Sequence, residues 1–299
     1  MCLVASACSA GSVDTTGQTE RTTKSPTTST TSTFAATSTT TSTTLAPTTT
    51  VVTAIATTRP EASGCVVETP SADVDTDFYA KQCTVFGIPV LSSAAVEDEA
   101  HRGAEAVIVG MMSTRPDLVA EMIDNGLRVG IIGVDQVTTD LPEYADLNTL
   151  FPETDWDTRI RGVGATLAIP MTSVGEENLL CLESDVYRGE SVMVHEFAHS
   201  VRGLGIATSD RELDLRIENA YEAAMATGLW TDTYAADNSD EYWAEAVQSY
   251  FDTNLAADPA DGIHGPIDTN AELAGYDPRL YGVIDSVFGE SAWRYVCPP

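Results

Sequence analysis

The sequence is poor in basic residues, with 15 lysines and arginines against 45 aspartates and glutamates. Its formal net charge of −30 argues against nucleic acids and anionic lipid surfaces as partners, because both are polyanions. The chain also lacks an apolar run of about eighteen residues, the length that spans a bilayer. We therefore expect no transmembrane helix, and no nucleic acid among the partners.

Charge is absent altogether between Lys24 and Arg59, where the sequence is mostly threonine and serine with scattered alanine and proline. Such a segment buries too little apolar surface to offset the entropy lost on ordering. We predict a disordered stalk over residues 9–61 and one globular domain over 62–299. A domain of about 240 residues is large enough to bury a catalytic core.

Residues 3–8 resemble the end of a bacterial lipoprotein signal peptide, in which a cysteine that follows small residues becomes lipidated. A basic start and a full apolar stretch are missing before Cys8, although a signal peptide requires both. We expect a start codon placed too late, a truncated signal peptide at residues 1–8, and a lipid on Cys8. The location would then be extracellular or cell-surface, with the membrane reached only through this anchor. The alternative is a disordered N-terminus in which Cys2 and Cys8 are idle.

None of the remaining cysteines stands in a C-x-x-C pair, so a cysteine zinc site is not expected. These are Cys65, Cys83, Cys181 and Cys297, and an even number in an exported chain argues for two disulfides. Three pairings are possible in principle. We expect Cys65 to pair with Cys83 and Cys181 with Cys297, because the first bond would fix the start of the domain and the second its end.

Residues 195–199 read His-Glu-Phe-Ala-His, which is the H-E-x-x-H motif. Side chains four apart share a face of a helix, so His195 and His199 can bind one zinc ion. Glu196 lies about 100° further round the helix, beside the metal, where it can accept a proton from water. A chance motif on a surface helix is the alternative, but the apolar residues around it predict a partly buried helix over 191–203 that ends in Gly-Leu-Gly.

A catalytic zinc needs a third protein ligand and an open position for water. Metzincins place a glycine and a histidine shortly after the motif, but Arg202 and Gly205 occupy those positions here. The third ligand must therefore come from further along the chain.

The best source of this ligand is residues 238–247, which read as the start of a helix. Asn238 or Ser239 can cap it, and acidic residues follow in the first turn. Glu241 and Glu245 share one face, which suggests one metal ligand and one carboxylate that orients a ligating histidine. The alternative is an acidic first turn that only complements the helix dipole.

The motif at 195–199, followed by Tyr234 and by Glu-Tyr-Trp-Ala-Glu-Ala at 241–246, resembles the catalytic domain of the anthrax lethal factor family of zinc metallopeptidases. In that family the first glutamate of the second motif completes the metal shell, and a tyrosine before it stabilises the oxyanion. The resemblance implies that Glu241 is the third ligand, Glu245 a supporting carboxylate and Tyr234 the oxyanion donor. It covers about residues 190–250 and does not extend to the toxin's substrate.

The expected fold class is α+β and zincin-like: a small mixed sheet packed on the H-E-x-x-H helix, followed by a helical C-terminal half. Hydrophobic periodicity and turn residues predict the following elements: strands at 87–92 and 128–133, helices at 94–112, 116–125 and about 209–227, and a strand-rich segment at 162–180. A sheet edge in this last segment would hold an extended peptide. Residues 229–237 are expected to form the loop that carries Tyr234.

Other candidates are weaker. His264 either donates a hydrogen bond in the active site or, as we favour, is a loop histidine bonded to backbone. His101 is expected on the surface of its helix, and Tyr242 and Trp243 are expected in the core.

The sequence thus predicts an exported, monomeric zinc metallopeptidase of the gluzincin type, with one Zn²⁺ held by His195, His199 and Glu241 and a peptide or protein as substrate. One rival is a non-catalytic surface binding lipoprotein on the same scaffold. Another is a metallohydrolase that cleaves cell-wall amides. Glu196 argues against the first rival, because a structural zinc site has no use for a base. Nothing in the sequence separates a peptide from a cell-wall amide.

Overall fold

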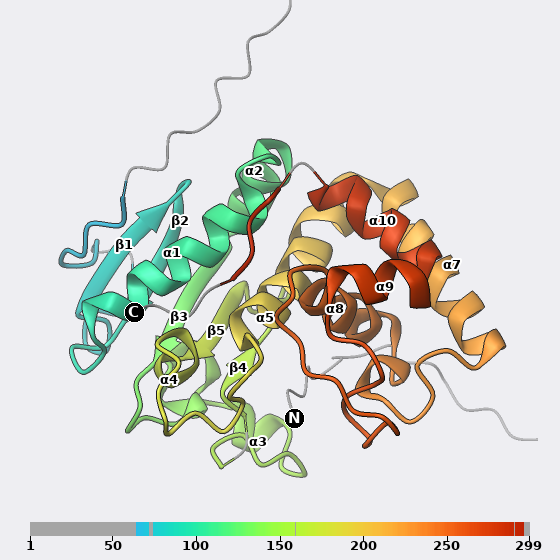
Figure 1. Ribbon diagram of the computed structural model, residues 1–299. Coiled ribbons are helices and arrows are strands. Elements are labelled where there is room, and N and C mark those ends of the chain that lie inside the picture. Colours follow the sequence, from blue (N-terminus) through green and yellow to red (C-terminus); the bar gives the residue numbers. More distant parts are fainter. Residues whose placement is uncertain (1–63, 72–73, 159, 290, 296–299) are drawn as a thin grey trace, which may run out of the picture. The chain divides into compact units, whose positions relative to one another are not determined.

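In the computed structural model, residues 64–71, 74–158, 160–289 and 291–295 are described (Figure 1). The signal peptide, Cys8 and the stalk predicted from the sequence lie outside these residues, as does Cys297. No helix within the described ranges is long and apolar enough to cross a membrane.

A five-stranded mixed sheet forms the N-terminal half of the domain, with the strand order β1-β2-β3-β5-β4 (Figure 1). Strands β2, β3 and β5 are parallel, and β1 and β4 pair antiparallel with β2 and β5 at the two edges. The strands are β1 (Lys81–Val85), β2 (Ile88–Ser92), β3 (Arg128–Ile132), β4 (Gly162–Val163) and β5 (Met171–Gly175). The mixed α+β class predicted from the sequence is confirmed.

Strands β2 and β3 lie where hydrophobic runs predicted them, but β1 was not predicted. Its residues are mostly polar, and it pairs with β2 through a two-residue turn at Phe86 and Gly87. Both turn residues have positive φ, 53° and 96°, as a tight hairpin turn with the twist of its strands requires. A phenylalanine at positive φ is rare, which is why the sequence gave no hairpin signal here.

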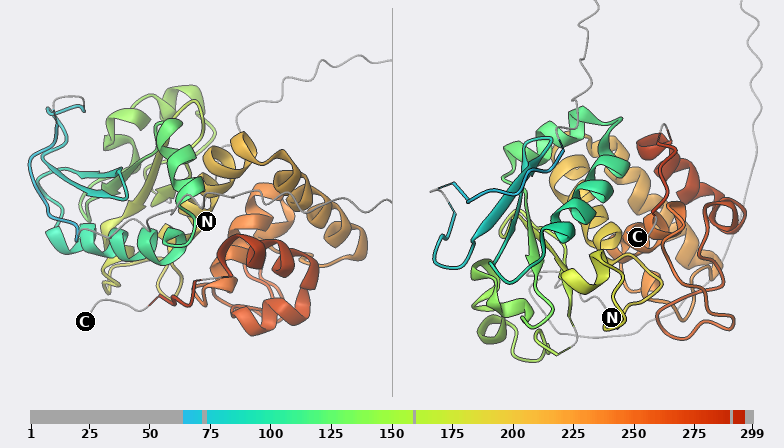
Figure 2. Two further views of the ribbon diagram at one scale, coloured as in Figure 1. Left: turned by 90° about the horizontal axis from the view of Figure 1, so that it is seen from above. Right: turned by 60° about the vertical axis from the view of Figure 1, so that its left-hand side comes forward.

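The helices and short helical turns are α1 (Asp98–Met112), α2 (Pro116–Asp124), η1 (Thr138–Asp140), η2 (Pro142–Tyr144), α3 (Leu147–Leu150), α4 (Glu176–Leu179), α5 (Val192–Ser200), η3 (Val201–Ile206), α6 (Ala207–Ser209), α7 (Arg211–Thr227), η4 (Tyr234–Ala236), α8 (Ser239–Tyr250), α9 (Asn270–Tyr276) and α10 (Pro278–Phe288). Helix α5 contacts β4 and β5 on one side and α8 on the other. Helices α7 to α10 lie on the side of α5 away from the sheet (Figure 1 and Figure 2). The helix that carries the H-E-x-x-H motif is therefore central.

The prediction that His101 lies on the surface is wrong. Helix α1 packs on the sheet, and His101 shares its covered face with Ala104 and Ile108, so all three are fully buried. The ring Nε2 lies 3.3 Å from the Ser92 hydroxyl. Burial disfavours the charged imidazole and lowers the pKa of His101 to about 4.

The prediction that the motif helix stops at Gly203-Leu204-Gly205 is also wrong, because the chain continues as the π-helical segment η3 to Ile206. Each glycine costs a helix about 1 kcal/mol. Leu204 and Ile206 are fully buried, and burying each side chain stabilises by about 1.5–3 kcal/mol. Packing therefore outweighs the local glycine signal.

Cys65 and Cys83 form a disulfide bond, which joins the segment before the sheet to β1. Cys181 is also disulfide-bonded. Its expected partner, Cys297, lies outside the described residues, so that pairing stays a prediction.

The edge strand approaches α5 closely at Gly164, the residue after β4. A Cβ atom at this position would lie 2.6 Å from the Cβ of His199, a separation that real Cβ atoms do not show. We expect Gly164→Ala to lower the free energy of unfolding by about 1–3 kcal/mol, as overpacking does elsewhere. Urea unfolding of the metal-free protein measures this difference.

The matched control is Gly282→Ala in α10, where a Cβ would meet no atom within 4 Å. This change should raise stability by about 0.5–1 kcal/mol, because it removes glycine's backbone entropy from a helix. Equal stability of Gly164→Ala and the parent would contradict the close packing of the edge strand on α5.

Candidate metal centre

Helix α5 begins at a side-chain cap and is buried on every face. The Ser191 hydroxyl accepts a hydrogen bond from the Val194 amide at 3.3 Å, and all nine residues of the helix are buried. Five of the nine are apolar, but His195, Glu196 and His199 are buried too. A buried polar group costs free energy unless it has a hydrogen-bond partner, an opposite charge or a metal ion beside it. The neighbours of these three side chains therefore indicate the function of the helix.

Three potential ligand atoms converge where α5 faces α8. The Nε2 atoms of His195 and His199 are 3.1 Å apart, and Glu241 Oε2 lies 3.2 Å from the first and 3.4 Å from the second. All three side chains are buried. Within the described ranges, they form the group of histidine, cysteine and acidic residues that could hold a metal ion.

The chemistry of this group fits zinc. Two imidazole nitrogens and one carboxylate oxygen are the protein donors of a catalytic zinc site. Glu241 Oε1 is buried and has no hydrogen-bond partner among the described residues. A buried carboxylate in this state is costly, and a cation bound by its group would offset the cost. The residues that the sequence singled out are therefore those that could hold the metal.

Helix α8 places Glu241 through its N-cap. The Asn238 side chain accepts hydrogen bonds from the amides of Asp240 and Glu241, at 2.9 and 3.0 Å, so Asn238 is the cap of the two candidates left open by the sequence. The indole of Trp243 donates to the Ala198 carbonyl at 2.9 Å, which ties α8 to α5. Tyr242 and Trp243 are fully buried, as predicted.

The far side of the His195 ring faces two side chains of α8. Its Nδ1 lies 2.9 Å from Gln248 Oε1 and 3.4 Å from Glu245 Oε1. Glu245 is thus beside the ring, as the resemblance implied, but Gln248 is nearer and was missed. A signal for it exists, because Glu241, Glu245 and Gln248 are spaced i, i+4 and i+7 and share one face of the helix.

Glu196 and Tyr234 flank the same histidines. Glu196 is fully buried, and Gly162 of the edge strand passes so close that a Cβ there would lie 2.9 Å from Glu196 Cγ. Tyr234 is 5% exposed, and its ring is stacked on that of His195 with centroids 6.2 Å apart. The structure therefore brings together all the residues to which the sequence gave a catalytic or metal-binding part, and their roles stay predictions.

Charge is strongly coupled within the group. Burial disfavours the charged form of His195, but its interactions with Glu241 and Glu245 prevail and raise the pKa of His195 well above 6.5. Burial also disfavours the Glu241 carboxylate, yet the neighbouring His199 and His195 lower the pKa of Glu241 to about 2. Without a metal, a proton on the His195 ring balances the Glu241 carboxylate.

His264 does not join the group, and among the described residues its ring faces carboxylates and not the backbone, contrary to the prediction that we favoured. Its Nδ1 lies 3.5 Å from an Asp261 oxygen and its Nε2 3.6 Å from a Glu190 oxygen. The Glu190 carboxylate beside the ring raises the pKa of His264. The His264 ring is therefore paired with two carboxylates outside the metal-binding group.

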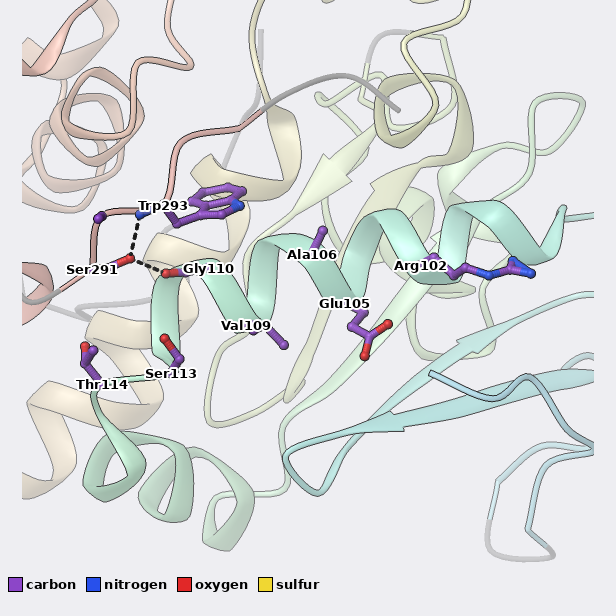
Figure 3. Close-up of a pocket in the computed structure, with 10 residues that line it drawn as sticks. Arg102, Glu105, Ala106, Val109, Gly110, Ser113, Thr114, Ser291 and Trp293 are labelled. Carbon is purple, nitrogen blue, oxygen red and sulfur yellow. Dashed lines mark hydrogen bonds between the residues drawn. The ribbon is translucent and has the colours of Figure 1, made fainter. Parts of the chain in front are cut away.

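A cavity of about 620 Å³ lies elsewhere, between α1 and the segment 291–295 (Figure 3). The Trp293 ring packs over Gly110, and the Ser291 hydroxyl donates to the Gly110 carbonyl at 2.6 Å. None of the potential metal ligands lines this cavity. Its size alone is no reason to place the chemistry there, because the described residues around it include no cluster of metal-binding side chains.

Comparison with protein-family models gives no match, and no curated protein matches the sequence. Among solved structures, the chain is similar to the PRO-PRO endopeptidase PPEP-2 from Paenibacillus alvei, with 17% sequence identity and a TM-score of 0.40. The likeness covers 63% of this chain and 92% of the other. At this TM-score it is too weak to carry an argument about activity, so the function must be argued from the residues of this chain.

The raised pKa of His195 makes zinc binding sensitive to pH. At pH 7 the metal-free ring is protonated, and zinc must displace that proton, so binding should release about one proton. The apparent affinity should fall as pH decreases, by about tenfold per pH unit for each proton displaced. Titration calorimetry in two buffers of different ionisation enthalpy measures the proton count.

The matched control is His264→Gln, which removes another histidine of raised pKa that lies outside the group. It should leave the number of released protons unchanged. Zinc binding with no buffer dependence at pH 7 would contradict the protonation of His195.

Proposed function

We propose that this protein is a zinc-dependent peptidase of the gluzincin type, with its catalytic domain in residues 62–299. The observation that carries the proposal is the convergence of His195, His199 and Glu241 beside the buried Glu196. A structural zinc site is closed by protein ligands and needs no neighbouring base. The resemblance of residues 195–199 and 241–246 to the lethal factor family is a second support.

Each side chain then has one task. Zinc, when bound, supplies Lewis-acid polarisation of a carbonyl and lowers the pKa of water toward about 7. Glu196 accepts the proton of the attacking water and later passes it to the leaving amine. Tyr234 donates a hydrogen bond to the oxyanion that develops on the carbonyl. A comparable donor contributes about 2.7–4 kcal/mol to lowering the barrier.

The edge strand gives the substrate a place to bind. Among the strands of the described residues, β4 is the last on its side of the sheet and pairs with β5 alone. An extended peptide can add to such an edge through backbone hydrogen bonds. The backbone at Gly162 and Gly164 lies close to the side chains of Glu196 and His199. A peptide aligned with β4 would therefore run beside the catalytic side chains. This favours a peptide or protein substrate over a cell-wall amide.

The N-terminal sequence extends the proposal to the cell surface. Lipidation at Cys8 would anchor the chain, and the stalk over residues 9–61 would hold the domain away from the membrane. The enzyme would then act as a surface lipoprotein on extracellular peptides. A non-catalytic binding module with the same anchor is the rival, and the next experiment separates the two.

Glu196→Gln keeps the size and polarity of the side chain but removes the base. We expect the variant to bind zinc and peptide normally, while turnover of a peptide library falls by about 10²–10⁴, the usual contribution of general base catalysis. Glu222→Gln, on the exposed part of α7, is the matched control and should keep full turnover. Equal turnover in Glu196→Gln and the parent, with zinc present in both, would refute the mechanism.

Tyr234→Phe tests the oxyanion donor. The ring and its stacking on His195 are kept, so zinc content and fold should be unchanged. The kcat should fall by about 10²–10³, with a smaller effect on KM, because the hydrogen bond strengthens only in the transition state. Tyr281→Phe in α10 serves as the control tyrosine change. An unchanged kcat would reduce Tyr234 to a packing residue.

A further inference from the structure

Gln248 connects the first histidine of the motif to the start of its helix. The side chain is 1% exposed and lies on α8, one turn beyond Glu245. Its Oε1 is 2.9 Å from His195 Nδ1, and its Nε2 donates to the Ser191 carbonyl at 3.2 Å. Ser191 is the N-cap of α5, so one buried amide contacts both the cap and the ligand histidine of the same helix.

These contacts fix which end of the amide faces the ring. The Ser191 carbonyl can only accept a hydrogen bond, so the NH₂ group of Gln248 must point to it. The amide oxygen then faces His195, and since that oxygen can only accept, Nδ1 must carry the hydrogen. Zinc binding removes one proton from the ring, and the neutral imidazole that remains has one N–H, so its lone pair is left on Nε2. Nε2 is the atom that faces Glu241 and His199.

Glu245 is the competing partner of the same N–H, but it is held elsewhere. Its Oε1 is 3.4 Å from Nδ1, beyond the range of a good hydrogen bond. Its Oε2 accepts from the Asn254 amide at 3.2 Å, and Asn254 also donates to the Glu245 carbonyl at 3.1 Å. The glutamate is therefore held by Asn254, in the segment that follows α8, whereas Gln248 has the shorter contact with the ring.

The neutral amide also suits the charge of its surroundings. The His195 ring already interacts with the carboxylates of Glu196, Glu241 and Glu245. A further carboxylate at position 248 would add repulsion with Glu245, one turn earlier on the same helix face. An amide accepts the hydrogen bond without adding charge.

We propose that Gln248 is a positioning residue, which holds the His195 ring in the orientation and tautomer that present Nε2 to the metal. The inference rests on the zinc site of the proposed function, but not on the identity of the substrate. A partner of this kind typically changes metal affinity by about 10–100-fold when it is removed. Gln248 would therefore set how tightly zinc is held.

The test compares zinc affinity in Gln248→Met, which keeps the length of the side chain without its hydrogen bonds, with that in Glu245→Gln. Affinity is measured by competition with a chromophoric chelator, and thermal unfolding of the metal-free proteins checks the fold. We expect Gln248→Met to lose about 10–100-fold in affinity. Glu245→Gln should lose less. Parental affinity in Gln248→Met, or a larger loss in Glu245→Gln, would overturn the proposal.

A second measurement does not depend on the amount of zinc bound. In the zinc-loaded protein, the ¹⁵N-correlated signal of the His195 Nδ1–H should be protected from solvent exchange in the parent and in Glu245→Gln, which keeps Gln248. In Gln248→Met the signal should exchange faster. An unprotected signal in the parent, or full protection in Gln248→Met, would also overturn the proposal.

Neither measurement uses peptide cleavage, so the two proposals can fail separately. A parent protein that binds no zinc would refute the proposed function. A parent that binds zinc, together with a Gln248→Met variant that binds it equally well, would refute only the role of Gln248.

Discussion

The packing of α5 against α8 is the contact on which the candidate site depends. Helix α5 carries two histidines and a glutamate, and α8 supplies Glu241, Glu245 and Gln248 from one face. Neither helix alone could bury these groups, because a buried charge without partners costs several kcal/mol. Brought together, the two helices pair both histidines with Glu241, and His195 also with Gln248. The Trp243–Ala198 hydrogen bond and the apolar residues beside it hold this arrangement in place.

Much of the site could be predicted because its parts are local in sequence. His195 and His199 are four residues apart, as are Glu241 and Glu245, and this spacing places each pair on one face of a helix. The structure has both pairs in helices, α5 and α8. The spacing of Gln248 carries the same information. Gln248 was missed because glutamine is not a typical zinc ligand, so only the carboxylates of this helix were considered as candidates. The hydrogen bond that matters joins it to a residue 53 positions away.

The fold predictions that were missed or wrong share one cause. Contacts with other parts of the chain override the preference of the local sequence. The polar strand β1 forms because β2 is adjacent and a hairpin turn joins them, even though Phe86 is unusual at positive φ. The segment 201–206 stays helical past two glycines because Leu204 and Ile206 are buried. His101 is internal because the sheet covers its face of α1. In each case the structure of the segment is decided by residues outside the few positions from which the prediction was made.

The burial of His101 gives the sheet half of the domain an intrinsic sensitivity to acid. Its pKa is about 4 in the folded chain and about 6.5 when unfolded, so between these values the unfolded chain binds a proton that the folded chain does not. Stability should therefore decrease as pH falls from about 6.5 to about 4, by roughly 3 kcal/mol in total, and this contribution is constant outside that window. This sensitivity to acid comes from the packing of helix α1 on the sheet and does not involve the residues of the candidate metal centre.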